Sequence, residues 1–321
     1  MIAKRATALL LAACLAVSAA VAGTFPDKPV EAIVPWGTGG GGDLVFRAMA
    51  AVFPKHANGQ PLLIKNIPGA AGVPGIVEFM KAKPDGYTVA HWNGAQTIKT
   101  HMSETPYTAT QFKGVANIVN DNFYILALAD SKFKTLKDVI DYAKANPGEL
   151  TFGNAGIGGG THFAQVMFED AVGIDVIEVP FKGGGPLITG LLSGDVEVSS
   201  NIMPEGATNI QNGQINILCI FSADRHPAFP DAPTAREQGV DLVIGQYRGI
   251  VAHPDTPDER VAELTEIFRK VIADPDFVKQ ITDMGSTIEF LDGPAYAKTI
   301  AEDDAAYSRI IKEKKLGDLH K

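Results

Sequence analysis

The sequence is poor in cysteine, with only Cys14 and Cys219 among 321 residues. Cys14 lies in an N-terminal segment that we expect to be removed, which would leave Cys219 without a partner. Cys219 stands in the apolar run 217–220, where a buried thiol behaves as a small apolar side chain. The sequence therefore excludes a fold that disulfide bonds hold together.

Positive charge is also scarce, because 28 Lys and Arg residues face 37 Asp and Glu residues, a net charge of −9. No basic cluster occurs, which argues against nucleic acid or anionic lipid as a partner. Beyond the N-terminal segment there is no second run of about 20 apolar residues, the length that spans a bilayer. We expect a soluble, exported chain that attracts an anion only locally.

Signatures of catalysis are missing as well. The chain contains no G-x-S-x-G, H-E-x-x-H or C-x-x-C motif, and its seven histidines are too widely separated to give a local metal-binding spacing. We therefore expect no cofactor, no metal and no enzymatic activity. A catalytic triad assembled only in space stays open as an alternative.

The first 22 residues have the pattern of a secretory signal peptide. Lys4 and Arg5 precede the apolar segment 6–19, and residues 20–22 form a small-x-small cleavage pattern. Cleavage there removes two positive charges and takes the net charge from −9 to −11. The alternative is lipidation at Cys14, since residues 11–14 resemble a lipoprotein cleavage box.

The mature chain repeats a strand, a glycine-rich loop and a helix, a pattern that favours a parallel α/β sheet. About 300 residues exceed the usual size of one hydrophobic core, so we expect two lobes, 23–123 plus 245–321 and 124–244. A crossing segment over 110–122 precedes a new strand from 123. The three units have their strands at 30–34, 150–152 and 176–179, their loops at 35–43, 153–162 and 180–186, and their helices at 44–53, 163–168 and 187–192.

The first loop, 35–43, has the chemistry of an anion site, because successive glycines and a helix N-terminus bring unpaired N–H groups together. Gly37, Gly39 and Gly42 match G-x-G-x-x-G, but the next strand lacks the acidic residue of a dinucleotide fold. Asp43 stands where a P-loop needs lysine, and we predict that it is the helix N-cap. A smaller anion and a purely structural turn both remain open.

The order of several motifs resembles the Bug family, the periplasmic solute-binding proteins of tripartite tricarboxylate transporters. The resemblance covers essentially the whole mature chain. Its motifs are Pro-Trp-Gly through Gly-Asp at 35–43, Pro-Asp-Gly-Tyr-Thr at 84–88, Asn-Ala-Gly-Ile-Gly at 154–158 leading to His162, Pro-Phe-Lys-Gly at 180–183, and Pro-Asp-Ala-Pro-Thr at 230–234 followed by Glu237 and Gly239.

This resemblance implies a two-lobed α/β clamp of the type II periplasmic-binding-protein kind, with the ligand in a crevice between the lobes. It also implies that backbone amides of the first two loops hold one carboxylate of the ligand. The ligand-binding residues expected from the loops are Trp36, Gly37, Thr38, Gly39, Gly40, Asn154, Gly158, Gly159, Gly160, Thr161, His162, Phe181, Lys182 and Gly183, and Asn201 is added because it follows a predicted strand at 196–198.

The loops depart from the family pattern at several positions. Thr38 follows Gly37 where alanine is usual before the glycines, Gly159 and Gly160 stand where serines are common, and Phe181 stands where tyrosine is usual. The second loop often begins with serine, where this chain has Asn154. These changes remove hydroxyl groups and side-chain bulk, so the ligand's identity cannot be copied from relatives.

Individual side chains keep two possible roles each. Lys182 could pair with a carboxylate or anchor its loop, and Trp36 could cover the ligand or pack the crevice wall. His162 could contact the ligand or make core hydrogen bonds, and Thr161 could offer its hydroxyl or act as an N-cap. Arg248 is expected to be structural.

The resemblance thus predicts a monomeric periplasmic protein that binds a small organic carboxylate, with a dicarboxylate expected, and delivers it to membrane permease subunits. A ligand-presenting sensor for a membrane receptor is the alternative within binding proteins. A periplasmic enzyme that acts on a carboxylate is the alternative from another class.

Overall fold

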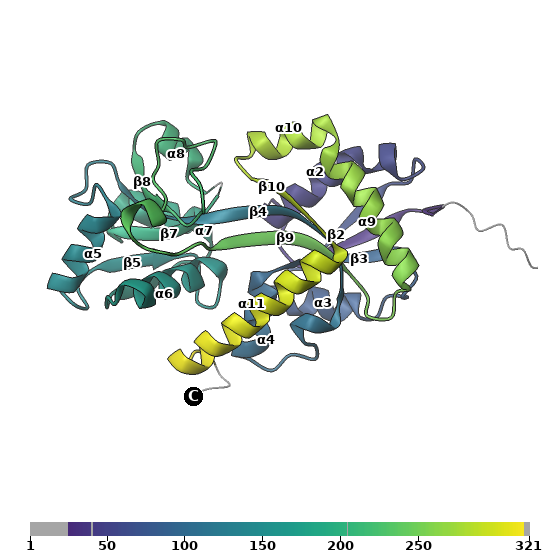
Figure 1. Cartoon of the computed structure of the whole chain (residues 1–321), viewed down its shortest axis with the longest axis horizontal. Coiled ribbons are helices and arrows are strands. Elements are labelled where there is room, and N and C mark those ends of the chain that lie inside the picture. The colour runs from purple at the N-terminus through teal and green to yellow at the C-terminus, as the bar shows by residue number, and fades with distance from the viewer. Residues whose placement is uncertain (1–24, 40, 204, 318–321) are drawn as a thin grey trace, which may run out of the picture.

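The computed structural model describes residues 25–39, 41–203 and 205–317, so the predicted signal peptide, Cys14 and Gly40 lie outside the described residues. Helices and strands gather at two ends of an elongated molecule, and the strands β4 and β9 run between them (Figure 1). In chain order the elements are β1 (Val30–Val34), α2 (Gly41–His56), β2 (Leu62–Asn66), η1 (Ala70–Gly72), α3 (Val73–Phe79), β3 (Thr88–Asn93), α4 (Gly94–Met102), η2 (Ala109–Gln111), β4 (Lys113–Leu128), α5 (Leu136–Ala145), β5 (Thr151–Asn154), α6 (Gly160–Val172), β6 (Ile177–Pro180), α7 (Gly184–Ser193), β7 (Val198–Ile202), α8 (Ala207–Gln211), β8 (Ile215–Ile220), η3 (Arg236–Gln238), β9 (Gly245–Ala252), α9 (Asp258–Ala273), α10 (Pro275–Asp283), β10 (Ile288–Asp292) and α11 (Gly293–Lys314).

The three predicted strand–loop–helix units are confirmed as β1–α2, β5–α6 and β6–α7. The prediction of a parallel sheet is only partly right. β1 pairs in parallel with β2 and β3, and β5 pairs in parallel with β6 and β7. β4 pairs antiparallel with β7, β8, β9 and β10, and β3 pairs antiparallel with β9. Parallel neighbours need a helical crossover, so the parallel pairs lie where the helices connect strands.

The predicted crossing segment over 110–122 does run between the two ends, but the new strand predicted from 123 is wrong, because residues 113–128 form the single 16-residue strand β4. Its first part pairs with β9 and β10, and its last part pairs with β7 and β8. One strand therefore belongs to the sheet at both ends of the molecule. Asparagines and an aspartate interrupt the apolar pattern of β4, which is why its middle was not recognised as a strand.

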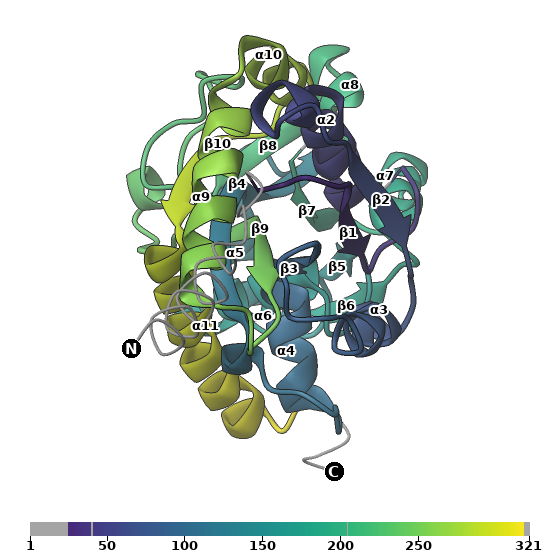
Figure 2. The same cartoon turned by 90° about the vertical axis from the view of Figure 1, so that its right-hand side faces the viewer.

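Each end of the molecule has side chains packed on both faces of its sheet. At one end Val30 and Ala32 of β1 pack with α2 and α9, while Ile33 packs on the opposite face with α3 and α11. Figure 2 shows these helices around β1. At the other end Ile125 of β4 joins one core and Leu126 the other. This alternation has the period of two expected for strands buried on both faces.

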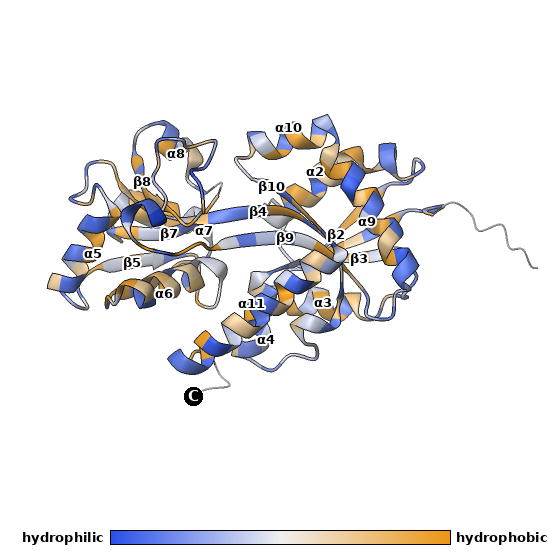
Figure 3. Ribbon diagram, viewed as in Figure 1, coloured by the Kyte–Doolittle hydropathy of each residue, from blue (hydrophilic) through white to orange (hydrophobic). Residues whose placement is uncertain are grey.

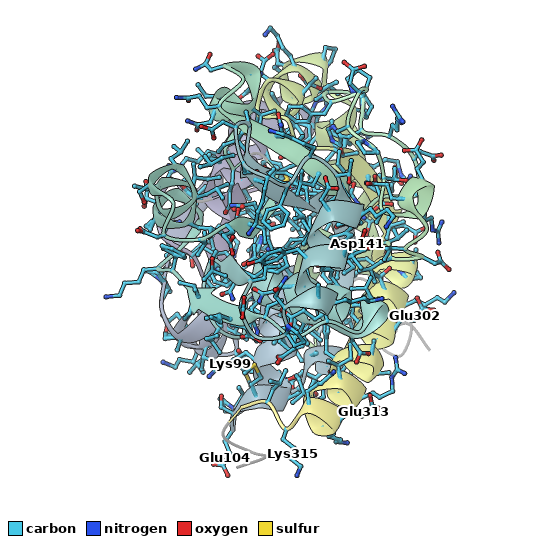
Figure 4. All side chains as sticks on the ribbon, turned by 90° about the vertical axis from the view of Figure 1, so that its left-hand side faces the viewer. Lys99, Glu104, Asp141, Glu302, Glu313 and Lys315 are labelled. Carbon is cyan, nitrogen blue, oxygen red and sulfur yellow. The ribbon has the colours of Figure 1, made fainter. Side chains whose placement is uncertain are left out.

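The helices present apolar residues to the sheet and polar residues to solvent (Figure 3). Asp141 on α5 and Glu302 and Glu313 on α11 are exposed at the surface (Figure 4). Cys219 is buried in β8, as predicted, and burial raises the pKa of its thiol to about 12. At both ends of the molecule, helices cover a sheet. Between the ends, the long strands β4 and β9 connect the two parts.

Gly249 allows β9 to lie close to its neighbours. A Cβ added at Gly249 would lie 2.4 Å from the Tyr296 ring carbon Cζ and 2.6 Å from the carbonyl oxygen of Ala116. Neither the β4 backbone nor the packed ring of α11 can move away easily. Only glycine therefore fits here, next to Arg248 on β9.

We expect Gly249→Ala to lower the free energy of unfolding by about 1–3 kcal/mol, the usual penalty for overpacking a core. Gly185→Ala is the matched control, because a Cβ added at Gly185 meets nothing within 4 Å. Urea unfolding followed by circular dichroism would compare the two variants. Equal midpoints for both would contradict the close approach at Gly249.

Candidate functional site

A cavity of about 740 Å³ lies where the parallel strands end. Its wall is built from residues that follow β1, β3, β5, β6 and β7 and from two side chains of β9. The carboxyl ends of parallel strands are the usual ligand position in α/β sheets. The position of the cavity therefore follows from the strand–loop–helix units.

Four helices begin at this cavity. Gly41 of α2, Ala95 of α4, Gly160 of α6 and Gly184 of α7 line it, and each belongs to the first turn of its helix. The first N–H groups of a helix have no partner within the helix, and its N-terminus carries partial positive charge. The wall is consequently suited to negatively charged groups.

Two side chains of β9 lie against two of these helix starts. A Cβ added at Gly41 would lie 3.0 Å from Nη2 of Arg248, and one added at Gly160 would lie 2.5 Å from Oε1 of Gln246. Arg248 and Gln246 are two residues apart on a strand, so their side chains point to the same face. β9 thus contributes to the wall beside both the first and the second loop.

Arg248 is almost entirely buried, with 5% of its surface exposed, and its guanidinium pairs with the buried carboxylate of Asp121 on β4. Burial lowers the pKa of Arg248 to about 10, so the side chain stays charged at neutral pH. The Arg248 guanidinium and the N-terminus of α2 are two positive groups side by side. Asp121 offsets part of this charge, and an anion in the cavity would offset more.

Trp36 forms part of the cavity wall, and the buried side chain of His91 fixes its position. Its Nε1–H donates to Nδ1 of His91 over 3.0 Å. His91 is fully buried, and burial, together with the charge of Arg248, lowers its pKa to about 3. A neutral His91 keeps Nδ1 as an acceptor, so Trp36 has a fixed orientation.

The prediction that Asp43 is the N-cap of its helix is wrong. α2 begins at Gly41, which puts Asp43 within its first turn. Its Oδ2 accepts from the N–H of Gly39 over 2.8 Å and from Arg47, and its Oδ1 accepts from Asn66. Burial raises the pKa of Asp43, but these hydrogen bonds outweigh it and lower the pKa overall. The Gly39 amide is therefore used by the protein itself.

The second loop is braced by its own polar side chains. Thr161 lies in the helix rather than at its N-cap, and its Oγ1 accepts from the N–H of Ala155 over 2.9 Å. Nδ1 of His162 accepts from the N–H of Gly158, and its Nε2 lies 3.1 Å from Glu178. Asn154 accepts from Gly156 and donates to Gln165. The loop is thereby shaped before any ligand arrives.

The third loop brings a positive side chain to the cavity, and a negative side chain from the segment after β7 lies beside it. Lys182 is exposed and lines it, and Glu205, which follows β7, lines it beside Gly184. Asn201 is buried within β7 and donates to Oε2 of Glu205 over 3.1 Å. Phe181 packs in the core, against the positions of Gly153 and Gly190.

The residues predicted from sequence fall into two groups. Those that line the cavity are Trp36, Gly37, Thr38, Gly158, Gly159, Gly160, Thr161, Lys182 and Gly183. Gly39, Asn154, His162, Phe181 and Asn201 lie outside its wall and support the loops, and Gly40 lies outside the described residues.

Sequence reasoning missed several wall residues, of which Asn93, Glu205, Gln246 and Arg248 have polar side chains. Asn93 had a readable signal, because Asn93 and Gln96 form a capping box that starts α4 directly after a strand. Gln246 and Arg248 alternate with apolar residues in 245–252, a weaker signal for one strand face. Glu205 had no local signal.

Within the described ranges, no group of three or more His, Cys, Asp or Glu side chains could hold a metal ion. None of the helices in these ranges is long and apolar enough to cross a bilayer. The polar groups of the described wall are backbone amides, the side-chain amides of Asn93 and Gln246, the hydroxyls of two threonines, the indole of Trp36 and three charged side chains, which are Lys182, Glu205 and Arg248.

Comparison with known proteins gives a consistent result. A sequence profile described as tripartite tricarboxylate transporter family receptor, TctC, matches residues 45–316. A UPF0065 protein in the gbd 5′ region of Cupriavidus necator is 30% identical over 92% of this chain and 90% of its own. Protein BugT of Bordetella pertussis is 27% identical over 91% of both chains.

Two solved structures have the same fold. A TctC solute-binding protein from Polaromonas, without ligand, has a TM-score of 0.80 and 30% identity, covering 90% of this chain and all of that one. MatC from Rhodopseudomonas palustris, with bound malate, has a TM-score of 0.76 and 25% identity, covering 89% of this chain and all of that one. The profile, the relatives and the folds agree, so the chain belongs to the TctC/Bug family of tripartite tricarboxylate transporter receptors, which are two-lobed α/β periplasmic solute-binding proteins.

Proposed function

We propose that the protein captures a small organic carboxylate in the cavity and delivers it to a membrane permease of the tripartite tricarboxylate type. The observation that carries the proposal is the Arg248 guanidinium against the first turn of α2 in the cavity wall. Two positive groups held together in a buried place are stabilised by a bound anion. The bound malate of the structurally similar MatC supports a carboxylate as that anion.

The ligand would touch both lobes at once. We propose the lobe boundaries predicted from sequence, 23–123 plus 245–321 and 124–244. Two apolar cores lie almost entirely within each part, and a fifth core, which contains Ile98, Phe163 and Tyr307, lies where the parts meet. Of the wall residues, Trp36, Gly37 and Thr38 belong to the first lobe. Residues 158–161 and Lys182 belong to the second lobe. A ligand held by both loops binds the closed arrangement better and shifts the population toward it.

The proposed function also includes export of the chain and release of its ligand. We propose that residues 1–22 are cleaved on export, that the mature chain acts as a periplasmic monomer, and that the ligand is released to the permease unchanged. Incubating the protein with its ligand and recovering the ligand intact by NMR would support binding without turnover. Conversion of the ligand would point to an enzyme.

We expect a thermal-shift screen of residues 23–321, refolded without ligand, to respond to carboxylates. The panel would hold C3 to C10 mono-, di- and tricarboxylates, amino acids, aromatic acids, neutral sugars and amines. A ligand at 100 times its Kd adds about 2.7 kcal/mol, and each kcal/mol raises the melting temperature by about 2–4 °C. A shift with sugars or amines and none with any carboxylate would contradict the proposal.

We expect Gly37→Leu to weaken carboxylate binding by roughly tenfold or more, about 1.4 kcal/mol, without loss of stability. Gly37 lines the cavity, and a Cβ added there meets nothing within 4 Å, so the larger side chain has room in the empty protein. Gly185→Leu is the matched control, because Gly185 is also exposed and uncrowded but does not line the cavity. Calorimetric titration would measure both, and equal affinities would argue against the first loop as the site.

A further inference from the structure

Glu205 is the single negatively charged side chain among the described residues of the cavity wall. Its Oε2 accepts from Nδ2 of Asn201 over 3.1 Å and from the N–H of Ile202 over 3.3 Å. No described group donates a hydrogen bond to its Oε1. The side chain is therefore held in place by one oxygen while the other is free to accept.

The free oxygen lies at the start of α7. A Cβ added at Gly184 would lie 1.9 Å from Oε1 of Glu205, so the carboxyl group occupies the space that any other residue at 184 would need. A carboxylate is the group that a helix N-terminus stabilises. Glu205 thus places a carboxylate of the protein itself beside the start of α7.

At two other helix starts the side chain in the cavity wall comes from β9 and is not a carboxylate. Asp43, in the first turn of α2, is fully buried and does not line the cavity. Arg248 lies against Gly41 of α2 and Gln246 against Gly160 of α6. The wall therefore presents a cation, Arg248, beside α2 and a carboxylate, Glu205, beside α7. A ligand with one carboxylate and one hydrogen-bond donor fits both groups.

We infer that Glu205 determines the ligand's second polar group, and that this group is a hydrogen-bond donor, a hydroxyl or an ammonium, in place of a second carboxylate. This inference rests on the proposed function, because it assumes that one carboxylate binds beside Arg248. It replaces the dicarboxylate expected from the sequence. The physical reason is that a second carboxylate near Glu205 would meet like charge, whereas a hydroxyl or an ammonium can donate to Oε1 of Glu205.

Burial raises the pKa of the Glu205 carboxyl group overall, although the hydrogen bonds from Asn201 and Ile202 lower it in part. Those two bonds both end on a carboxylate oxygen and so favour the ionised form. Lys182 is also in the wall, but it is exposed, so water screens its charge more than that of the partly buried Glu205.

The test is a titration of residues 23–321 with matched ligands that differ only in their end group. At four carbons the set is 4-aminobutyrate, 4-hydroxybutyrate and succinate, and at six it is 6-aminohexanoate, 6-hydroxyhexanoate and adipate. We expect at least one donor-bearing acid to bind about tenfold or more tighter than the dicarboxylate of equal length. In Glu205→Gln this preference is expected to disappear or reverse, because the amide is neutral and can donate.

Glu205→Gln keeps an oxygen for Asn201 and Ile202, and its melting temperature without ligand checks that it folds. Glu197→Gln is the matched control. Glu197 directly precedes β7, the strand that Glu205 follows, and it pairs with Lys132 and does not line the cavity. A wild-type preference for dicarboxylates, above all one that grows as the pH falls, would overturn the inference and leave the proposed function intact. Equal loss of all ligands in Glu205→Gln would also overturn it, and no binding of any carboxylate would instead refute the proposed function.

Discussion

The site depends on the way β9 pairs with β4. This pairing buries Arg248 against Asp121 in the region where the two ends of the molecule meet. Removing one partner of such a buried pair leaves an uncompensated charge and costs about 3–5 kcal/mol. The same strand places Gln246 two residues away on the same face. The pairing of β9 with β4 therefore fixes both the ion pair and the position of the cation in the cavity.

The other feature on which the site depends is which side chain lies beside the N-terminus of each helix that begins at the cavity. α2, α4, α6 and α7 all begin at the cavity, and each has amides and partial positive charge to satisfy. Asn93 caps α4 and Glu205 lies at the start of α7, whereas α2 has Arg248 beside it. In the cavity wall, α2 and α6 thus have side chains of β9 beside their first turns, whereas α7 has a carboxylate. The charge pattern, rather than the glycine content, distinguishes one loop from another.

Much of the fold and part of the site could be predicted from sequence. The units β1–α2, β5–α6 and β6–α7 were predictable because a glycine loop between an apolar strand and an amphipathic helix is a local pattern. The long strand β4 was missed because polar residues at 117 and 120–122 break its apolar run. Asp43 was predicted to accept from backbone amides at the helix start, which it does at Gly39, but from the wrong position in the helix.

The sequence by itself determined the family, the α/β class and the three loops, since short-range spacing and glycine runs govern them. The tertiary structure alone decided which side chains face the cavity. His162 and Asn154 stand in the second loop yet turn to brace it, whereas Glu205 and Arg248 come from distant segments and reach the wall. The physical reason is that a side chain's direction on a strand depends on register, and register is set by pairing with a partner far along the chain.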